Sequence, residues 1–420
     1  MKGMSYIMKS INPEVTPMNQ TESNRLQEAV FNQTQALIDK HGARLAGTKP
    51  SLDCADDLYQ DALTFADTAH KEDFHVFRGA FLGWIRLLVF NYAASLVLLW
   101  LDLPLYAAIL ALTSLLVLLI QFVFYMPMLD RFYPKRKARN VYGIIEPEQP
   151  VETQVIVSGH HDSARIFNFY IHQPGLYNLR TTGSIAWVVV LLVMSVVLHV
   201  VTVPAPGPLI MRIVASAGFL LVGQMWFFAS RKGTSGAGDN LVASVIAWQL
   251  GRYYQQRKEA GHGLQSTRLI FMSFDAEEEG LRGARAYAKA HARDFERYPT
   301  YLLNADCLYD EKDLFFLTSD INNTVKLSDT LAQELADIAK SLGLPSKTQP
   351  LSFLTGGTDA AELAKKGVKA TTAIGMPWTN AARNAVYHTP EDTLDKVSPS
   401  LVGHTLMLFS TWIDRHDSKP

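Results

Sequence analysis

Histidine and carboxylate side chains recur directly after three short apolar runs of the sequence. The run QVIVS leads into GHHDS, which contains His160 and Asp162. The run LIFMSF leads into DAEEEG, which contains Glu277 and Glu278, and the run YLLN is followed by Asp306. Each run has the length and composition of a buried strand. Because open α/β sheets bind ligands at the carboxyl ends of their strands, we expect these side chains to meet at one edge of a sheet.

Two further segments contribute an aspartate and a histidine. Asp239 lies in GTSGAGDN ahead of a predicted helix at 241–259, and His388 lies in YHTPEDT, where Thr389 has the signature of a helix cap. Each residue alone fits ordinary capping chemistry. Together with the strand ends, the set offers two histidines and three carboxylates, which suit a pair of divalent ions that share one carboxylate.

Imidazole ligands favour zinc at such a site, although manganese or cobalt would be accommodated by the same atoms. Hydrolysis also needs a carboxylate that stays off the metals and acts as general base. The adjacent acids Glu277 and Glu278 could divide these two roles, because neighbouring residues at a strand end point in different directions.

The segments between these motifs predict an α/β domain in which short apolar strands alternate with amphipathic helices. The predicted strands are 74–77, 141–145, 154–158, 269–274, 301–304 and 370–374. The predicted helices are 23–40, 55–69, 241–259, 280–292, 328–342 and 358–366. No GxSxG, P-loop or GxGxxG motif occurs, which argues against the usual serine hydrolase and nucleotide-binding classes.

Four apolar stretches interrupt this domain, and each approaches the ~20 residues that a helix needs to cross a bilayer. They are 81–100, 105–126, 185–203 and 209–228. Short connections, LDLP and PAPGP, pair them into two hairpins, so we expect transmembrane helical hairpins. The alternative is buried core helices of a soluble protein, which the embedded polar residues Arg86, Asn91, His199 and Arg212 would suit.

Charge and cysteine content bear on partners and compartment. Lys plus Arg total 39 against 40 for Asp plus Glu, so no overall charge points to nucleic acid. Two cysteines, Cys54 and Cys307, form no disulfide framework, and residues 1–20 lack an apolar leader. Basic residues flank the hairpins on one side, which predicts a catalytic domain on the cytoplasmic side of the membrane.

The motifs together resemble the di-zinc aminopeptidase family, which also includes glutamate carboxypeptidases and glutaminyl cyclases. In chain order, the segments that carry the resemblance are IDKHGARLAGT, NVYGII, VIVSGHHDS, GAGDN, FDAEEEGLRGARAY, NAD, GGTDAAELAKKGV and YHTPEDTLDKV. The resemblance implies a mixed-sheet zinc exopeptidase domain, an α/β/α sandwich, here interrupted by two transmembrane hairpins. The expected boundaries are 1–79, 130–184 and 229–420 for the peptidase parts, and 80–129 and 185–228 for the hairpins.

Carried over position by position, the resemblance implies two zinc ions per chain. The implied ligands are His160 and Asp306 for one ion, Glu278 and His388 for the other, and Asp239 as the bridge. Glu277 would be the general base, Asp162 would orient the first histidine, and Tyr387 would donate a hydrogen bond to the oxyanion. We expect His161 to be a non-ligand and Glu279 to be a solvated acid in a first helical turn.

The expected reaction is hydrolysis of a terminal peptide bond by metal-activated water, most simply as an aminopeptidase, with peptide substrates and a lipid bilayer as partners. A carboxypeptidase or dipeptidase would need a cation for the terminal carboxylate, and Arg383 is the candidate. Glutaminyl cyclase activity is a further alternative, as is a non-catalytic membrane receptor or scaffold. The oligomeric state is not predicted.

Overall fold

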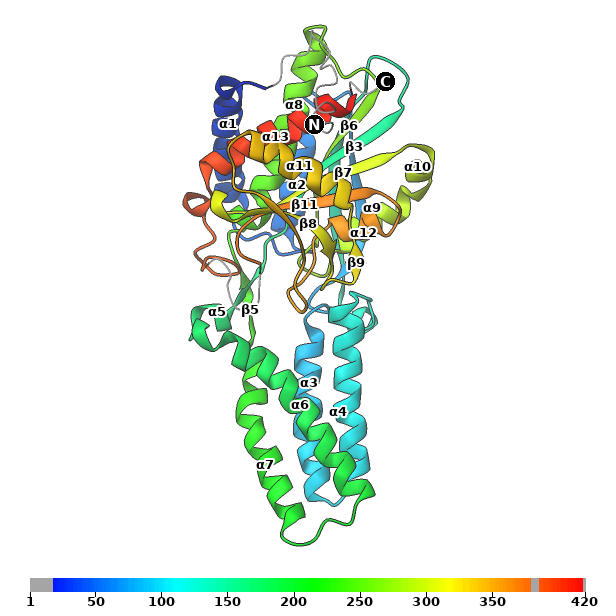
Figure 1. Ribbon diagram of the computed structural model, residues 1–420, viewed down its shortest axis with the longest axis vertical. Coiled ribbons are helices and arrows are strands. Elements are labelled where there is room, and N and C mark those ends of the chain that lie inside the picture. Colours follow the sequence, from blue (N-terminus) through cyan, green and yellow to red (C-terminus); the bar gives the residue numbers. More distant parts are fainter. Residues whose placement is uncertain (1–17, 379–384, 418–420) are drawn as a thin grey trace, which may run out of the picture.

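The protein consists of an α/β domain and a bundle of four long helices that extends from one end of it (Figure 1). The computed structural model describes residues 18–378 and 385–417. Arg383 and nearly all of the segment 1–20, on which two of the sequence predictions depend, lie outside these residues.

Within the described residues, the strands form a nine-stranded mixed sheet and a small two-stranded sheet. The large sheet has the order β1 (Thr68–Phe77), β2 (Lys135–Ile145), β6 (Thr267–Phe274), β3 (Thr153–His160), β7 (Thr300–Leu308), β11 (Lys369–Gly375), β8 (Leu314–Asp320) and β10 (Lys347–Pro350), with β9 (Val325–Lys326) on β8. The small sheet pairs β4 (Arg165–Phe167) with β5 (Ala229–Gly233). The central strand β3 is parallel to both β6 and β7, whereas β2 and β8 run antiparallel to their inner neighbours.

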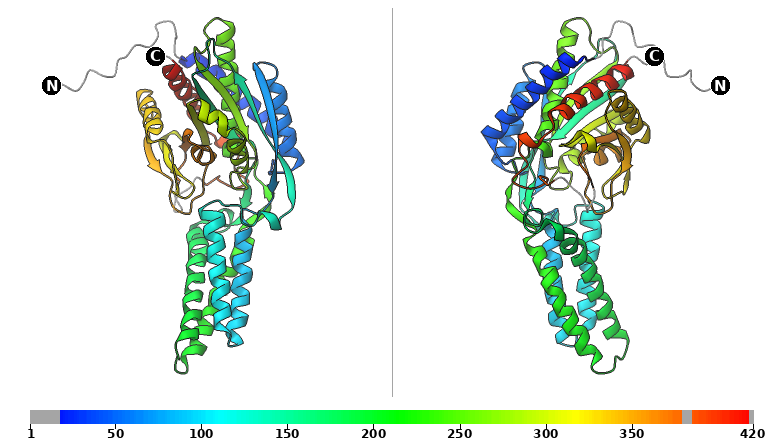
Figure 2. Two further views of the ribbon diagram at one scale, coloured as in Figure 1. Left: turned by 90° about the vertical axis from the view of Figure 1, so that its right-hand side faces the viewer. Right: turned by 60° about the vertical axis from the view of Figure 1, so that its left-hand side comes forward.

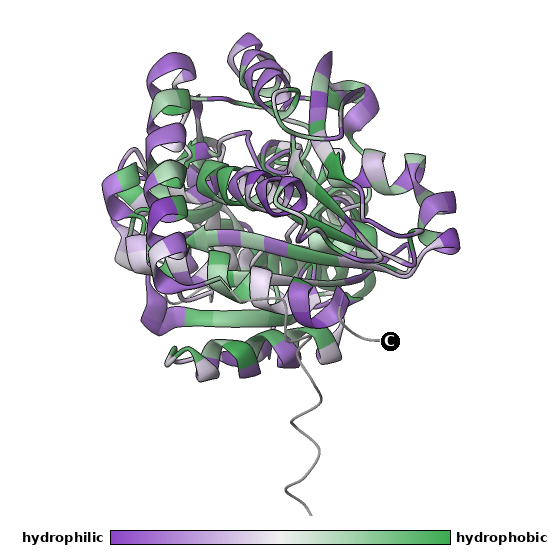
Figure 3. Ribbon diagram, turned by 90° about the horizontal axis from the view of Figure 1, so that it is seen from above, coloured by the Kyte–Doolittle hydropathy of each residue, from purple (hydrophilic) through white to green (hydrophobic). Residues whose placement is uncertain are grey.

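Helices cover both faces of the large sheet. One face packs against α1 (Gln20–His41), α2 (Lys49–Ala62), α8 (Val242–Glu259), α11 (Asp329–Ser341) and α13 (Pro399–Asp417). The other face packs against α9 (Arg282–Ala290) and α12 (Ala360–Ala364), and α10 (Ala292–Arg297) follows α9 at the edge. Figure 3, a view along the long axis, shows hydrophilic residues on the outer sides of these helices.

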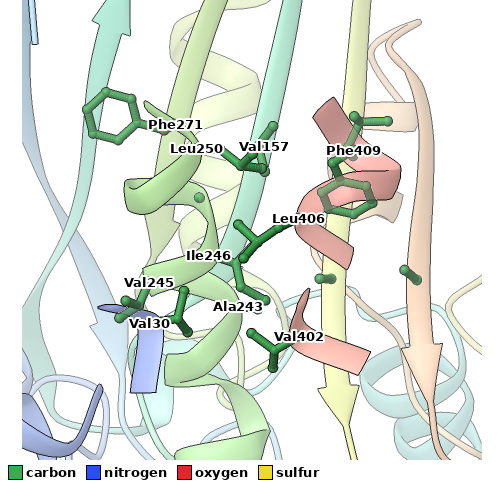
Figure 4. Packing of buried hydrophobic residues seen from close by; sticks show 14 of the residues in the cluster. Val30, Val157, Ala243, Val245, Ile246, Leu250, Phe271, Val402, Leu406 and Phe409 are labelled. Carbon is green, nitrogen blue, oxygen red and sulfur yellow. The ribbon is translucent and has the colours of Figure 1, made fainter. Parts of the chain in front are cut away.

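Successive side chains of β3 point to opposite faces of the sheet, so one strand contributes to the hydrophobic core on both faces. Val155 and Val157 pack into the cluster under α8, whereas Ile156, between them, packs into the cluster under α9. Figure 4 shows Val157 with Ile246 of α8 and Leu406 of α13. The predicted mixed α/β sheet with helices on both faces is therefore confirmed.

The four-helix bundle consists of α3 (Gly83–Trp100), α4 (Pro104–Leu118), α6 (Tyr177–Val200) and α7 (Gly207–Val222), and the short helix α5 (Asn168–Ile171) precedes α6. With the helical turns next to them, all four are long and apolar enough to cross a membrane. The third begins at Tyr177, well before the apolar stretch predicted from residue 185. Figure 2 shows that the α/β domain lies entirely at one end of the bundle.

The helix predicted at 55–69 is α2, which spans Lys49–Ala62, because Pro50 lies in its first turn and the chain enters β1 at Thr68. Other predicted helix starts also differ from the structure. The helix expected from residue 280 begins at Arg282, because a turn through Leu281, with a φ of 61°, precedes it. No helix begins at Thr389, whose hydroxyl donates to the Val386 carbonyl over 2.8 Å within a turn. The next long helix is α13, which begins at Pro399.

Candidate metal centre

Three neighbouring parallel strands bring the predicted site residues together. His160 is the last residue of β3, and Glu277 and Glu278 follow the end of β6, which pairs with β3 on one side. Asp306 lies near the end of β7, which pairs with β3 on the other side. Because parallel strands end at the same edge, these four side chains converge as predicted.

Asp239 stands between two histidines. Its Oδ1 lies 3.4 Å from Nε2 of His160, and its Oδ2 lies 3.1 Å from Nε2 of His388. The residue belongs to a turn, Ala237–Leu241, that precedes α8, and its side chain does not cap that helix. A Cβ at position 238 would overlap the Tyr309 ring, so Gly238 is what lets this turn pack closely against the site.

Among residues 18–378 and 385–417, three sets of side chains each place potential ligand atoms within 4.8 Å of one another, and the sets share members. The sets are His160 with Asp239 and Asp306, Asp239 with Glu278 and His388, and His160 with Glu277 and Glu278. The first two contain the residues that the resemblance assigns to two ions, joined through Asp239. Imidazole nitrogens and carboxylate oxygens are the donors that zinc prefers, so these residues fit the metal.

The electrostatics of the site also fit a bound cation. Burial, and then repulsion from Asp239, raises the pKa of the Asp306 carboxyl to about 7, against the opposing effect of His160. Burial likewise raises the pKa values of Glu277 and Glu278 well above their usual range, and nearby carboxylates add to the effect. So many buried acids repel one another unless positive charge is placed among them, which a divalent ion would do.

Asp162 connects two of the strand ends. Nδ1 of His160 lies 3.0 Å from the Asp162 backbone carbonyl and 3.3 Å from its carboxylate. The same carboxylate accepts hydrogen bonds from the backbone N–H groups of Glu277, at 3.1 Å, and Glu278, at 3.2 Å. One buried side chain thus holds the histidine ring and the loop of both glutamates. This arrangement suits the orienting role predicted for it.

We expect Asp162→Asn to weaken zinc affinity by about 10- to 100-fold, as changes next to metal ligands do. The amide keeps the shape but loses charge, and its NH₂ group cannot accept a hydrogen bond. Competition with a chromophoric chelator would measure the affinity. Asp395→Asn, an exposed aspartate later in the chain, is the matched control and should bind zinc like the unaltered protein. Equal affinity in both variants would contradict the orienting role.

Two residues that support the site received no role from the sequence. The buried Arg44 guanidinium donates to the carbonyls of His161, Ser235 and Gly236 over 2.8–3.0 Å, and so fastens the loop before Asp239. Asp392 accepts hydrogen bonds from the Gly238 N–H and the Tyr309 hydroxyl, both at 2.9 Å. Both lie inside the quoted motifs HGARLAGT and YHTPEDT, which is the signal that could have found them.

Other buried polar residues near the centre have structural partners. His161 faces away from the ligand sets, with its Nδ1 2.8 Å from the Ser273 hydroxyl. The prediction of a solvated Glu279 is wrong, because this side chain is buried. Its carboxylate accepts a 2.7 Å hydrogen bond from the Gly79 N–H and lies 3.4 Å from the Arg165 guanidinium.

A cavity of about 130 Å³ opens from the metal centre toward the helix bundle. Glu277, Glu278, His388 and the half-buried Tyr387 lie on the side of the cavity next to the ligand sets. The opposite wall comes from the bundle and the segments next to it, with Trp84, Ile85, Phe122, Ile185 and Met225. The apolar helices therefore form part of the cavity next to the ligand sets, called the active-site cavity below, and no local sequence signal predicts this.

Many solved structures share the fold of this protein. An aminopeptidase from Aneurinibacillus sp. strain AM-1 has 14% identity and a TM-score of 0.53, over 94% of this chain and 95% of that chain. A Zn-dependent exopeptidase from Parabacteroides distasonis has 13% identity and a TM-score of 0.54, over 95% and 99%. A glutaminyl cyclase from an Acidobacteriales bacterium has 15% identity and a TM-score of 0.54, over 97% and 100%. At identities this low, the similarity shows a shared fold and does not by itself show a shared activity.

Sequence comparison finds one family match in the second half of the chain. No curated protein matches the chain. Residues 219–413 match Peptidase family M28, and this range includes Asp239, Glu277, Glu278, Asp306 and His388. The resemblance found in the sequence is thereby confirmed over these residues, which make up less than half of the chain.

Proposed function

We propose that this protein is a membrane-embedded zinc exopeptidase that removes amino-terminal residues from peptides. The observation that carries the proposal is the position of Asp239, whose two carboxylate oxygens face His160 and His388 separately. A carboxylate placed in this way can join two ligand sets into one centre. The complete set of ligand types also argues against a non-catalytic receptor, which would be free to lose them.

Zinc, when bound, lowers the pKa of water and polarises the substrate carbonyl. Side chains of this protein would carry out the proton transfers and stabilise the oxyanion. Glu277 accepts the proton of the attacking water as the new C–O bond forms, and returns it to the leaving nitrogen as the peptide C–N bond breaks. Tyr387, on the cavity wall, donates a hydrogen bond to the developing oxyanion. The remaining carboxylates attract the free amino group of the substrate.

The cavity suggests which terminal residue is preferred. An apolar cavity of about 150 Å³ takes a benzene molecule, so a cavity of 130 Å³ with apolar and aromatic walls suits one large apolar side chain. Trp84, Phe122 and Ile185 would contact that side chain. We therefore propose peptides with a large apolar first residue as substrates.

Hydrolysis of matched peptides by purified, detergent-solubilised protein tests this function. Peptides with a free amino terminus and a first Leu or Phe should be cleaved, and kcat/KM should exceed that for a first Ala by roughly 10-fold or more. The same peptides with an acetylated amino terminus should resist cleavage. Release of residues from the carboxyl end of acetylated peptides would instead support a carboxypeptidase, with Arg165 on the cavity wall as the cation that binds the terminal carboxylate.

The surface of the bundle supports insertion into a membrane. Large apolar side chains face outward on all four helices, with Phe90 65% exposed and Leu220 79% exposed. Polar residues instead find partners within the bundle, as when Asn91 donates to the Ser114 hydroxyl at 3.0 Å. A soluble protein rarely exposes such a large apolar surface, so the bundle fits a bilayer better than water.

The distribution of charge predicts which side the peptidase domain occupies. Basic residues surround the end of the bundle that carries the α/β domain, whereas Arg212, paired with Asp102, lies at the far end. Positive flanks of short membrane segments stay cytoplasmic. A reporter fused after residue 420 should therefore be protected from external protease in sealed spheroplasts. Digestion from outside would reverse the orientation, and extraction of the protein by alkaline carbonate would contradict insertion itself.

A further inference from the structure

A second cavity, of about 370 Å³, lies where the α/β domain joins the helix bundle. Its wall combines the segment after β1, the first turn of α3, the segment leading into β2, and β4 with β5, all of which meet at this junction (Figure 2). Five arginines line it. They are Arg78, Arg86, Arg136, Arg165 and Arg231. Such a concentration of guanidinium groups around one cavity points to an anionic ligand.

The protein itself neutralises little of this charge. Within the described residues, Arg165 is the one member with a carboxylate partner, Glu279 at 3.4 Å. Arg86 lies over the Trp226 ring at 5.5 Å, which leaves its charge in place. Burial lowers the pKa of Arg78, and repulsion from Arg165 and Arg136 lowers it further, while Glu279 opposes the change. The cavity therefore carries several positive charges with a single acid among them.

The position of the cavity identifies the kind of anion. Its lining includes the first turn of α3, at the end of the bundle that joins the α/β domain (Figure 1). This position is headgroup depth for a helix bundle that crosses the bilayer. Tyr133 and Trp226 in its wall are residues typical of that depth. Guanidinium groups bind phosphate oxygens in pairs, and basic pockets beside membrane helices take anionic headgroups.

We propose that this cavity binds the phosphate headgroup of an anionic phospholipid. The proposal rests on the membrane assignment above and not on the peptidase chemistry. Ile85, Arg165 and Met225 line both this cavity and the active-site cavity. A bound headgroup therefore holds one wall of the active site in place, which gives the protein a means to respond to the lipid around it.

Lipid titration of the purified full-length protein in neutral detergent, followed by native mass spectrometry, tests the proposal. Phosphatidylglycerol should bind more tightly than phosphatidylcholine. The double variant Arg78→Gln with Arg136→Gln should bind phosphatidylglycerol about 10-fold more weakly or worse, since it removes two of the five guanidinium groups that line the cavity. The matched control is Arg131→Gln with Lys135→Gln, which removes the same charge from exposed positions that do not line the cavity. It should bind as the unaltered protein does.

Three results would overturn the proposal. Equal weakening in the control pair would show diffuse surface attraction, and equal binding of phosphatidylcholine would show that the anionic charge is not recognised. Tight binding of inorganic phosphate alone, lost in the Arg78 and Arg136 variant, would assign the cavity to a soluble anion. If the double variant does not fold, Arg231→Gln, which changes one exposed residue, carries the same comparison. Zinc content, which the lipid site leaves unchanged, separates failure here from failure of the peptidase assignment.

Discussion

Purified Asp239→Ala protein should retain at most one weakly held zinc ion per chain and lose peptidase activity. Both ligand sets depend on this side chain, because Oδ1 faces His160 at 3.4 Å and Oδ2 faces His388 at 3.1 Å. Metal coordination supplies several kcal/mol of transition-state stabilisation, so activity should fall by at least about 10³-fold. Elemental analysis after dialysis would count the ions.

The control for this experiment is Asp395→Ala, which alters an exposed aspartate whose partner is Lys396. It should keep the zinc content and activity of the unaltered protein. Two tightly bound zinc ions in Asp239→Ala would show that Asp239 is not a bridge, whatever the activity.

Glu277→Gln and Glu278→Gln should fail in different ways although the residues are adjacent. We expect Glu277→Gln to keep its zinc and to lose roughly 10²- to 10⁴-fold in kcat, because the amide cannot accept the water proton. Glu278 lies 3.4 Å from Nε2 of His388, within the set that contains Asp239, so Glu278→Gln should mainly lose metal. Each variant serves as the control for the other, since both remove one carboxylate from the same loop.

Zinc content and kcat measured on the same preparations would separate the two glutamates. The experiment is needed because the distances alone do not separate the two roles. Glu277 Oε2 lies 3.9 Å from Nε2 of His160, and both glutamates belong to a potential ligand set with His160. If Glu277→Gln loses zinc and regains full turnover when zinc is added, Glu277 is the ligand and the roles are exchanged.

The convergence of the site could be predicted because its residues sit beside strong local signals. His160, Glu277 and Asp306 each follow an apolar run that forms a central strand, and parallel strands fix where their ends meet. The two apolar hairpins could also be predicted from the sequence, because their length and composition alone indicate helices that leave the α/β domain and return to it.

Sequence signals gave wrong predictions for side chains whose environment depends on residues far away in the chain. Glu279 precedes a helical sequence and was expected in solvent, yet it is buried against Gly79 and Arg165, which lie far from it in the chain. Thr389 has the signature of a cap, but a threonine hydroxyl bonds to nearby backbone in turns as readily as at helix ends.

The active-site cavity could not be predicted for a related reason. Its wall joins Trp84 of α3, Ile185 of α6 and the metal centre, and only the packing of the bundle against the α/β domain brings them together. No periodicity or motif within any one segment indicates how the bundle packs against the α/β domain. The same holds for the arginine-lined cavity, whose members come from five separate segments.

A zinc titration of the metal-free protein would show whether peptidase activity depends on zinc. The protein would be stripped with a chelator and given known amounts of zinc, while hydrolysis of a peptide with a free amino terminus and a first Leu is followed. We expect no activity without zinc, and a rise in activity that reaches its limit near two ions per chain. Full activity in the stripped protein, or cleavage that zinc does not restore, would contradict a zinc exopeptidase built around Asp239.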